Sequence, residues 1–333
     1  MTANSKIDNA PNVPGPHIIP IDYEALYKLE EPPGYEPWDV YGWFLLSVAA
    51  QQTPMVMNPW MTVPDHVLQI KDVNFKEVDG IKLGLDVYQS KDDPGPRPLI
   101  LIIHGGYWKS GDKGVHVQQG IEFVELGYTA VSVNYRLSAD HKFPAGIEDI
   151  YDAVKFLTEN SAEYCIDPDR IVTYGGSAGG HLSAFIALAG NSPDRSYNQG
   201  INPKSFKGAL SMYGIHDLTL PIQREHPFTQ QFIGKTYEED PQSYREASPV
   251  FHVDSNDPPV LLVHGSLDGS VSVQNSDSLS AKLEEVGVPY TFDRVEGWSH
   301  GMDFFSPIGE RTLWYIYQFL KNFMPSDKMK ERE

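Results

Sequence analysis

Residues 170–189 read RIVTYGGSAGGHLSAFIALA. The first five are rich in β-branched and aromatic residues, as in a buried strand, and the residues from His181 onward have the composition of a helix. Between them stands a G-x-S-x-G pattern at 175–179, whose glycines permit a sharp turn from strand to helix. A serine on such a turn projects its hydroxyl away from the sheet. Ser177 is therefore the candidate nucleophile.

The same alternation of strand and helix extends over most of the chain. Runs at 66–78 and 81–88 are typical of an opening hairpin. Six buried-strand runs come next, at 98–103, 129–133, 170–174, 208–212, 259–263 and 290–295, and a closing helix is expected at about 309–323. The pattern predicts an α/β fold with a mostly parallel, eight-stranded sheet flanked by helices. In such sheets ligands meet the loops at the carboxyl ends of the strands.

Two residues that follow later strands are candidates for the base and the carboxylate that a nucleophilic serine needs. A serine hydroxyl reacts only when a base takes its proton, and a carboxylate must orient that base. Asp268 comes after the seventh strand run and His300 after the eighth. The order Ser177, Asp268, His300 is that of an α/β-hydrolase triad. Asp217 is the rival acid, and it is a weaker candidate.

The loop after the third strand run offers donors for a developing oxyanion. It reads HGGYW at 104–108, and paired glycines there place backbone N–H groups near the nucleophile turn. We expect the amides of Gly105, Gly106 and Ala178 to form the oxyanion hole. His104 is expected to be a structural hydrogen-bonding residue. Three aromatic residues beside the motifs are candidates for the substrate pocket: Tyr107, Trp108 and Trp298.

Three segments lie outside the expected core of the catalytic domain, which spans 66–323. Residues 1–65 are rich in proline and predict an N-terminal arm with short helices at 23–29 and 38–51, which could form part of a cap. Residues 216–253 combine prolines with aromatic residues and predict either a short cap insertion or a solvated connection. Residues 324–333 predict a charged tail.

Composition excludes several classes of function. The 333 residues carry a formal charge of −19, which disfavours nucleic acid as a partner. No apolar run is long enough to predict a membrane span, and no secretion signal is visible, so a cytoplasmic location is the default expectation, or a secreted one if a signal was removed. Cys165 is the single cysteine, so no intramolecular disulfide can form. No spacing of His, Asp and Glu predicts a metal site, and no glycine-rich loop predicts a cofactor.

Taken together, these motifs resemble the α/β-hydrolase superfamily. Within it, the chain is similar to small carboxylesterases, including hormone-sensitive-lipase-like and bifunctional acetyl xylan/feruloyl esterase-like enzymes. The resemblance covers about residues 66–323 and rests on the motifs at 104–108, 133–137, 143–149, 167–171, 174–181, 264–268 and 299–301. It implies that Arg136 and Asp149 form a buried structural pair. One departure is Tyr107, which stands where many lipase-like relatives have a third glycine.

The sequence therefore predicts a serine hydrolase that acts on esters of small acyl groups. Two alternatives stay open. The HGGYW wording is also similar to kynurenine formamidases, so an arylformamidase or another amidase could use the same triad. A ligand-binding protein without catalysis on the same fold is the second alternative. A small-molecule ester is the expected partner, and a homodimer is left open.

Overall fold

The computed structural model describes residues 61–93, 95–190, 198, 200–305 and 308–330. The helices expected at 23–29 and 38–51, and the arm up to residue 60, lie outside the described residues. Among the described residues, no helix combines the length and the apolar character that crossing a membrane requires.

Eight strands form one sheet, as the alternation of segments predicts. They are β1 (Val67–Val78), β2 (Ile81–Ser90), β3 (Arg97–Ile103), β4 (Thr129–Val133), β5 (Ile166–Gly176), β6 (Phe206–Met212), β7 (Val260–Gly265) and β8 (Tyr290–Val295). Their spatial order is β1-β2-β4-β3-β5-β6-β7-β8. Strand β2 is antiparallel to both β1 and β4, and every pair from β4 to β8 is parallel. The predicted hairpin and the mostly parallel sheet are confirmed.

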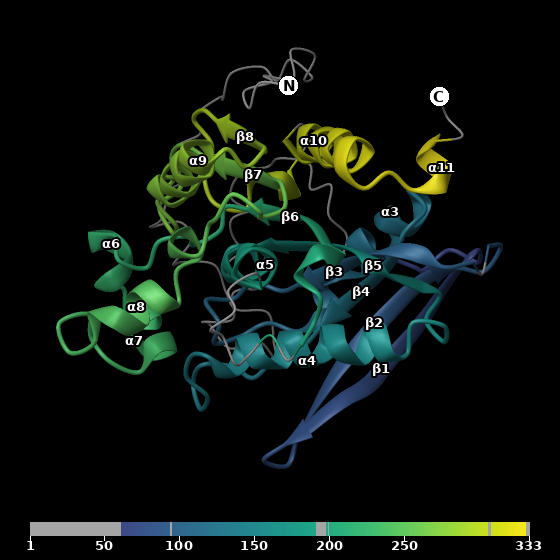
Figure 1. The fold of residues 1–333 in the computed structure, drawn as a ribbon, viewed down its shortest axis with the longest axis horizontal. Coiled ribbons are helices and arrows are strands. Elements are labelled where there is room, and N and C mark those ends of the chain that lie inside the picture. The colour runs from purple at the N-terminus through teal and green to yellow at the C-terminus, as the bar shows by residue number, and fades with distance from the viewer. Residues whose placement is uncertain (1–60, 94, 191–197, 199, 306–307, 331–333) are drawn as a thin grey trace, which may run out of the picture.

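Helices cover both faces of this sheet (Figure 1). The helices are α3 (Val117–Glu125), α4 (Ala145–Glu159), α5 (Ala178–Ala189), α6 (Pro221–Arg224), α7 (Pro227–Ile233), α8 (Pro241–Glu246), α9 (Gln274–Val286), α10 (Ile308–Phe323) and α11 (Asp327–Lys330). Short 3₁₀ turns are η1 (Lys113–His116), η3 (Pro203–Ser205), η4 (Pro249–Phe251) and η5 (Met302–Phe304). Helices α4, α5 and α9 pack on one face, and α3 and α10 pack on the other.

The central strand β3 shows why the layers form. Leu99, Leu101 and Ile103 point into the cluster with α4 and α5, while Ile100 and Ile102 point into the cluster with α3 and α10. All five side chains are fully buried. A strand covered on both faces needs apolar residues at every position, and this explains the continuous hydrophobic run of the sequence.

The opening hairpin is tied to the body by buried charges. Arg136 Nε donates a 2.8 Å hydrogen bond to Asp149 Oδ2, so the expected structural pair is present. Lys76 Nζ, on β1, donates to Asp149 Oδ1 at 2.6 Å and also lies 2.6 Å from Asp152. The Asp149 side chain is fully buried and meets positive charge from two sides, which compensates for its loss of hydration.

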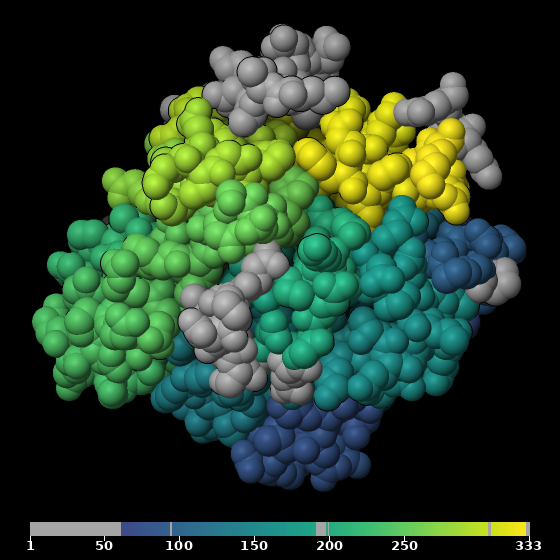
Figure 2. All heavy atoms as spheres, viewed as in Figure 1, coloured from purple at the N-terminus to yellow at the C-terminus, as the bar shows by residue number. Residues whose placement is uncertain are grey.

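Residues 216–253 form a lobe of short helices at one end of the molecule (Figures 1 and 2). Helices α6, α7 and α8 each begin with a proline, a residue that suits the first helical turn because that turn needs no N–H donor. Phe232 and Tyr244 of the lobe are almost fully buried against the main core. The lobe is thus a packed element, and its role as a cap stays a prediction.

The predicted charged tail is partly folded. It contains α11, and Met324 and Met329 are 1% and 3% exposed. The hydroxyl of Tyr128 donates a 2.7 Å hydrogen bond to the carbonyl of Met324. These contacts fix the segment against β4 and α3, which charge composition alone does not reveal.

Candidate active site

Ser177 lies on the turn between β5 and α5, where the G-x-S-x-G pattern places it. Its backbone has φ 58° and ψ −123°, a conformation that a residue with a side chain rarely adopts. Gly179 makes the turn fit, because a Cβ there would lie 2.1 Å from the carbonyl oxygen of Ile103. The Ser177 amide donates a 2.9 Å hydrogen bond to Met212 O, which secures the turn to β6.

Asp268 and His300 meet across the neighbouring loops. His300 Nδ1 lies 2.7 Å from Asp268 Oδ2, and because a carboxylate accepts, Nδ1 carries the hydrogen and Nε2 has the free lone pair. The amides of Ser270 and Val271 donate to Asp268 Oδ1 at 2.9 and 2.8 Å. Burial alone would raise the pKa of Asp268. The charge of His300 and the hydrogen bonds from His264 and His300 outweigh it and hold this pKa well below its usual range.

The rival acid has a different environment. Asp217 Oδ1 accepts hydrogen bonds from the amide and the hydroxyl of Thr219, at 2.9 and 2.5 Å. It therefore stabilises the turn after β6. The pairing of His300 with Asp268 is the arrangement that a triad requires.

Tyr213 connects the nucleophile turn with the candidate base, and sequence reasoning did not single it out. Its ring lies edge-on to His300, with centroids 4.5 Å apart. Its hydroxyl lies against Gly176, the residue before Ser177, since a Cβ on Gly176 would be 2.9 Å from that oxygen. Its position directly after β6, at the carboxyl edge of the sheet, is the one signal the sequence offers for it.

The loop after β3 lies against the nucleophile turn. A Cβ on Gly105 would lie 2.8 Å from Gly176 O and 3.4 Å from the Cβ of Ser177. Ala178 begins α5, so its N–H belongs to the first helical turn and has no partner within the helix. The backbones of Gly105 and Ala178 thus lie beside Ser177, and their role in an oxyanion hole stays a prediction.

Two aromatic side chains hold this loop in an unusual conformation. Gly106, Tyr107 and Trp108 have φ of 110°, 50° and 59° in succession. The Tyr107 hydroxyl donates a 3.0 Å hydrogen bond to Ser270 O, which ties the loop to the Asp268 turn. Trp108 Nε1 donates to His181 Nδ1 at 3.0 Å, and the indole stacks on Phe232 of the lobe.

The three predicted pocket residues have different surroundings. Trp108 is 1% exposed, so its environment is that of a core residue. Tyr107 is half-buried and stacks on His226, with a centroid distance of 4.9 Å and parallel rings, and it also contacts Phe228. Trp298 is half-buried in the loop that carries His300. A substrate role for Tyr107 and Trp298 stays a prediction.

Other histidines of the motifs are structural in their surroundings. His104 Nδ1 donates a 2.8 Å hydrogen bond to Gly105 O, and its ring stacks on Tyr135. His181 accepts from Trp108 and donates through Nε2 to Ala247 O at 2.7 Å. Burial lowers the pKa of both to about 4. Both rings are therefore neutral near neutral pH.

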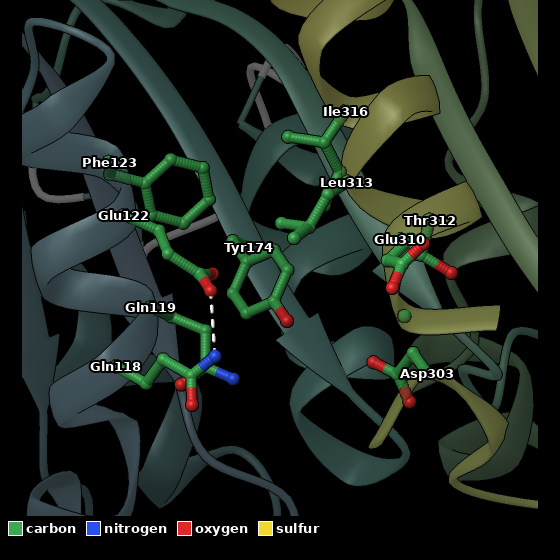
Figure 3. A pocket seen from close by; sticks show the side chains of 11 residues that line it. Gln118, Gln119, Glu122, Phe123, Tyr174, Asp303, Glu310, Thr312, Leu313 and Ile316 are labelled. Atoms are coloured by element: carbon green, nitrogen blue, oxygen red, sulfur yellow. Dashed lines mark hydrogen bonds between the residues drawn. The ribbon is translucent and has the colours of Figure 1, made fainter. Parts of the chain in front are cut away.

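A small pocket of about 60 Å³ lies between α3 and α10, close to the His300 loop (Figure 3). Gln118 and Glu122 line it from α3, joined by a 2.7 Å hydrogen bond, and Asp303 and Thr312 line it opposite. Burial raises the pKa of Asp303 to about 6. Among the described residues, no group of three or more His, Cys, Asp or Glu side chains could hold a metal ion. The pocket is an acidic, partly open region next to the candidate site.

Comparison with known proteins identifies the family of this chain. The family model described as BD-FAE matches residues 85–283. Esterase LipQ of Mycobacterium tuberculosis is 32% identical over 80% of this chain and 66% of its own length, and the probable carboxylic ester hydrolase LipM of the same organism is 31% identical over 71% and 57%. The chain thus spans less than two thirds of the length of either relative.

Two further matches broaden the comparison. The versiconal hemiacetal acetate esterase of Dothistroma septosporum is 27% identical over 69% of this chain and 73% of its own length. The solved structure of a truncated carbohydrate esterase from gut microbiota is 27% identical, with a TM-score of 0.66 over 76% of this chain and 96% of that one. The chain belongs to the BD-FAE family and has the α/β-hydrolase fold.

Proposed function

We propose that this chain hydrolyses carboxylic esters of small acyl groups, with Ser177 as nucleophile, His300 as general base and Asp268 as its orienting acid. The observation that carries the proposal is the 2.7 Å contact between His300 Nδ1 and Asp268 Oδ2. It leaves His300 Nε2 with a free lone pair at the same edge of the sheet as the strained Ser177 turn.

The chemistry proceeds through two acyl transfers. Ser177 Oγ attacks the ester carbonyl carbon while its proton passes to His300 Nε2, and Asp268 stabilises the resulting imidazolium. The carbonyl oxygen becomes an oxyanion that accepts hydrogen bonds from the amides of Gly105, Gly106 and Ala178. The intermediate then collapses, the C–O bond to the alcohol breaks, and the alkoxide leaves with the proton from His300. Water then attacks the acyl-enzyme while its proton passes to His300, the bond between the acyl carbon and Ser177 Oγ breaks, and Oγ takes the proton back from His300 as the carboxylic acid leaves.

A preference for small acyl groups is supported by the aromatic residues beside the oxyanion loop. Tyr107 stacks on His226 and contacts Phe228, so three rings from the loop and the lobe gather on one side of it. Ligand pockets are lined mainly by apolar and aromatic side chains, so rings at this position would reduce the space for an acyl chain. The acetate ester in the name of the Dothistroma relative agrees with this size class.

Turnover of p-nitrophenyl acetate, butyrate and octanoate, measured beside N-formylkynurenine, tests the proposal. Ester turnover that falls with chain length and disappears in Ser177→Ala is expected. Dominant turnover of the formamide would instead identify an arylformamidase. Inactivity of the folded protein on all four substrates would favour a binding protein.

A further inference from the structure

His264 contacts the acid of the candidate triad and has no part in the proposed mechanism. It lies near the end of β7, four residues before Asp268, and its side chain is fully buried. Its Nε2 lies 3.2 Å from Asp268 Oδ2 and 2.9 Å from the carbonyl oxygen of Val271.

The neighbours of His264 determine where its hydrogen lies. Both atoms close to Nε2 are acceptors, so Nε2 must carry the hydrogen and share it between them. Nδ1 lies 2.8 Å from the hydroxyl of Ser276, which can donate to it. Both ring nitrogens are therefore satisfied by the neutral imidazole, in the tautomer with hydrogen on Nε2.

Asp268 then has a complete set of donors. Its Oδ1 accepts from two backbone amides, its Oδ2 accepts from His300, and Nε2 of His264 lies 3.2 Å from the same Oδ2. We propose that His264 is a positioning residue for the catalytic acid, whose Nε2–H holds Asp268 Oδ2 in line with His300 Nδ1. The inference rests on the proposed roles of Ser177, Asp268 and His300.

The proposed contact from His264 restrains one oxygen atom, Oδ2 of Asp268. The amide bonds to Oδ1 fix one end of the carboxylate, yet the group can still rotate about the axis through that oxygen. A donor on Oδ2 from a buried, tautomerically fixed ring removes this freedom. It also spreads the charge of Oδ2 over two donors, so the hydrogen shared with His300 stays on the imidazole. Both effects keep His300 Nε2 directed at the nucleophile turn.

Two substitutions that differ by one methylene test this role. The amide nitrogen of His264→Gln can reach the place of Nε2 and donate to Asp268, whereas the shorter side chain of His264→Asn cannot. We expect kcat for p-nitrophenyl acetate to fall about tenfold or more in His264→Asn with KM little changed, and to recover largely in His264→Gln. The downfield NMR signal of the His300 Nδ1 proton should shift in the Asn variant and stay near its wild-type position in the Gln variant.

The outcomes separate this inference from the function it rests on. Wild-type kcat in a folded His264→Asn protein would overturn the positioning role, and so would equal losses in both variants, because packing and not the donor would then be at fault. Should the Asn variant fail to fold, histidine NMR of the wild-type protein decides: hydrogen on Nε2 of His264 is expected, and hydrogen on Nδ1 would overturn it. If Ser177→Ala keeps full ester turnover, the proposed function itself fails.

Discussion

Trp108 Nε1 donates a 3.0 Å hydrogen bond to Nδ1 of His181, and this contact joins the oxyanion loop to the helix that begins beside the nucleophile. Both residues are buried, and Nε2 of His181 in turn donates a hydrogen bond to the carbonyl oxygen of Ala247 in the lobe. The two backbone segments that would bind the oxyanion are thus fixed to each other through side chains.

Loss of this hydrogen bond should weaken both the fold and the site. Trp108→Phe keeps an aromatic ring against Phe232 but leaves His181 Nδ1 without its donor. We expect the free energy of unfolding to fall by about 1–3 kcal/mol and kcat to decrease. Urea unfolding and ester kinetics check this, with Trp314→Phe on α10 as the matched change. Wild-type stability in Trp108→Phe would contradict the expectation.

Asp268→Asn should abolish most activity without unfolding the protein. An asparagine can donate to His300 and so favour the wrong tautomer of the base, for which a loss of about 10⁴-fold in kcat is typical. Asp217→Asn is the matched control, because its carboxylate serves only a local turn and its amide oxygen can still accept from Thr219. Equal losses in the two variants would reject Asp268 as the acid.

Gly105→Ala should damage the oxyanion loop selectively. The added methyl would lie 2.8 Å from Gly176 O, so the loop must move away from Ser177. We expect kcat to fall about 10²- to 10³-fold, the cost typical of losing one oxyanion donor. Gly269→Ala is the control, since a Cβ there meets nothing within 4 Å. Full activity in Gly105→Ala would show that the loop has more room than the close approach implies.

Tyr107 should influence acyl chain length. Tyr107→Ala removes the ring from the group with His226 and Phe228, so turnover of octanoate relative to acetate should rise. Tyr107→Phe removes only the 3.0 Å bond to Ser270 O and should keep the chain-length profile. The ratio of kcat/KM for the two esters measures the effect. An unchanged ratio in the Ala variant would place the acyl group elsewhere.

Asp303 should make stability depend on pH. Burial raises its pKa from an ordinary 3.8 to about 6, so between these values the folded state binds more protons than the unfolded state. The free energy of unfolding contributed by this group therefore falls as pH rises through that window and stays low above it. Asp303→Asn should be more stable than wild type at pH ~8 by about 1–3 kcal/mol, relative to its difference at pH ~4.

Urea unfolding at both pH values measures this difference. Asp140→Asn, which changes an exposed carboxylate, is the control and should behave like the wild type. If the free energy of unfolding changes with pH in the same way in the wild type and in Asp303→Asn, the carboxyl is better hydrated than its burial implies.

The strands and the three triad candidates were predictable from the sequence for one shared reason. A buried parallel strand is apolar throughout, and the loops that leave the carboxyl ends of such strands gather at one edge of the sheet. Ser177, Asp268 and His300 could therefore be placed together without knowing a single distance. The start of β5 was less clear, because the charged run at 167–170 hides a strand that pairs with β3 from Ile166 onward.

Contacts between individual side chains were beyond sequence reasoning. Tyr213 contacts His300, 87 positions away, and His264 contacts Asp268, 4 positions away. Residue type alone reveals neither partner. The prolines of the lobe indicate interruptions when only the sequence is considered, yet Pro221, Pro227 and Pro241 each begin a helix. From the sequence alone, a proline at the first position of a helix cannot be distinguished from a proline in a loop. Only the packing of the following turn shows which of the two it is.

The close approach of Gly179 to Ile103 limits the substitutions that this protein can tolerate. Helix α5 and strand β3 touch there through bare backbone, and even a methyl group would fall 2.1 Å from an oxygen. A side chain at position 179 therefore requires β3 and α5 to move apart. A mutagenesis library aimed at new substrates should therefore leave 175–179 unchanged and vary the lobe and the rings of Tyr107, His226 and Phe228.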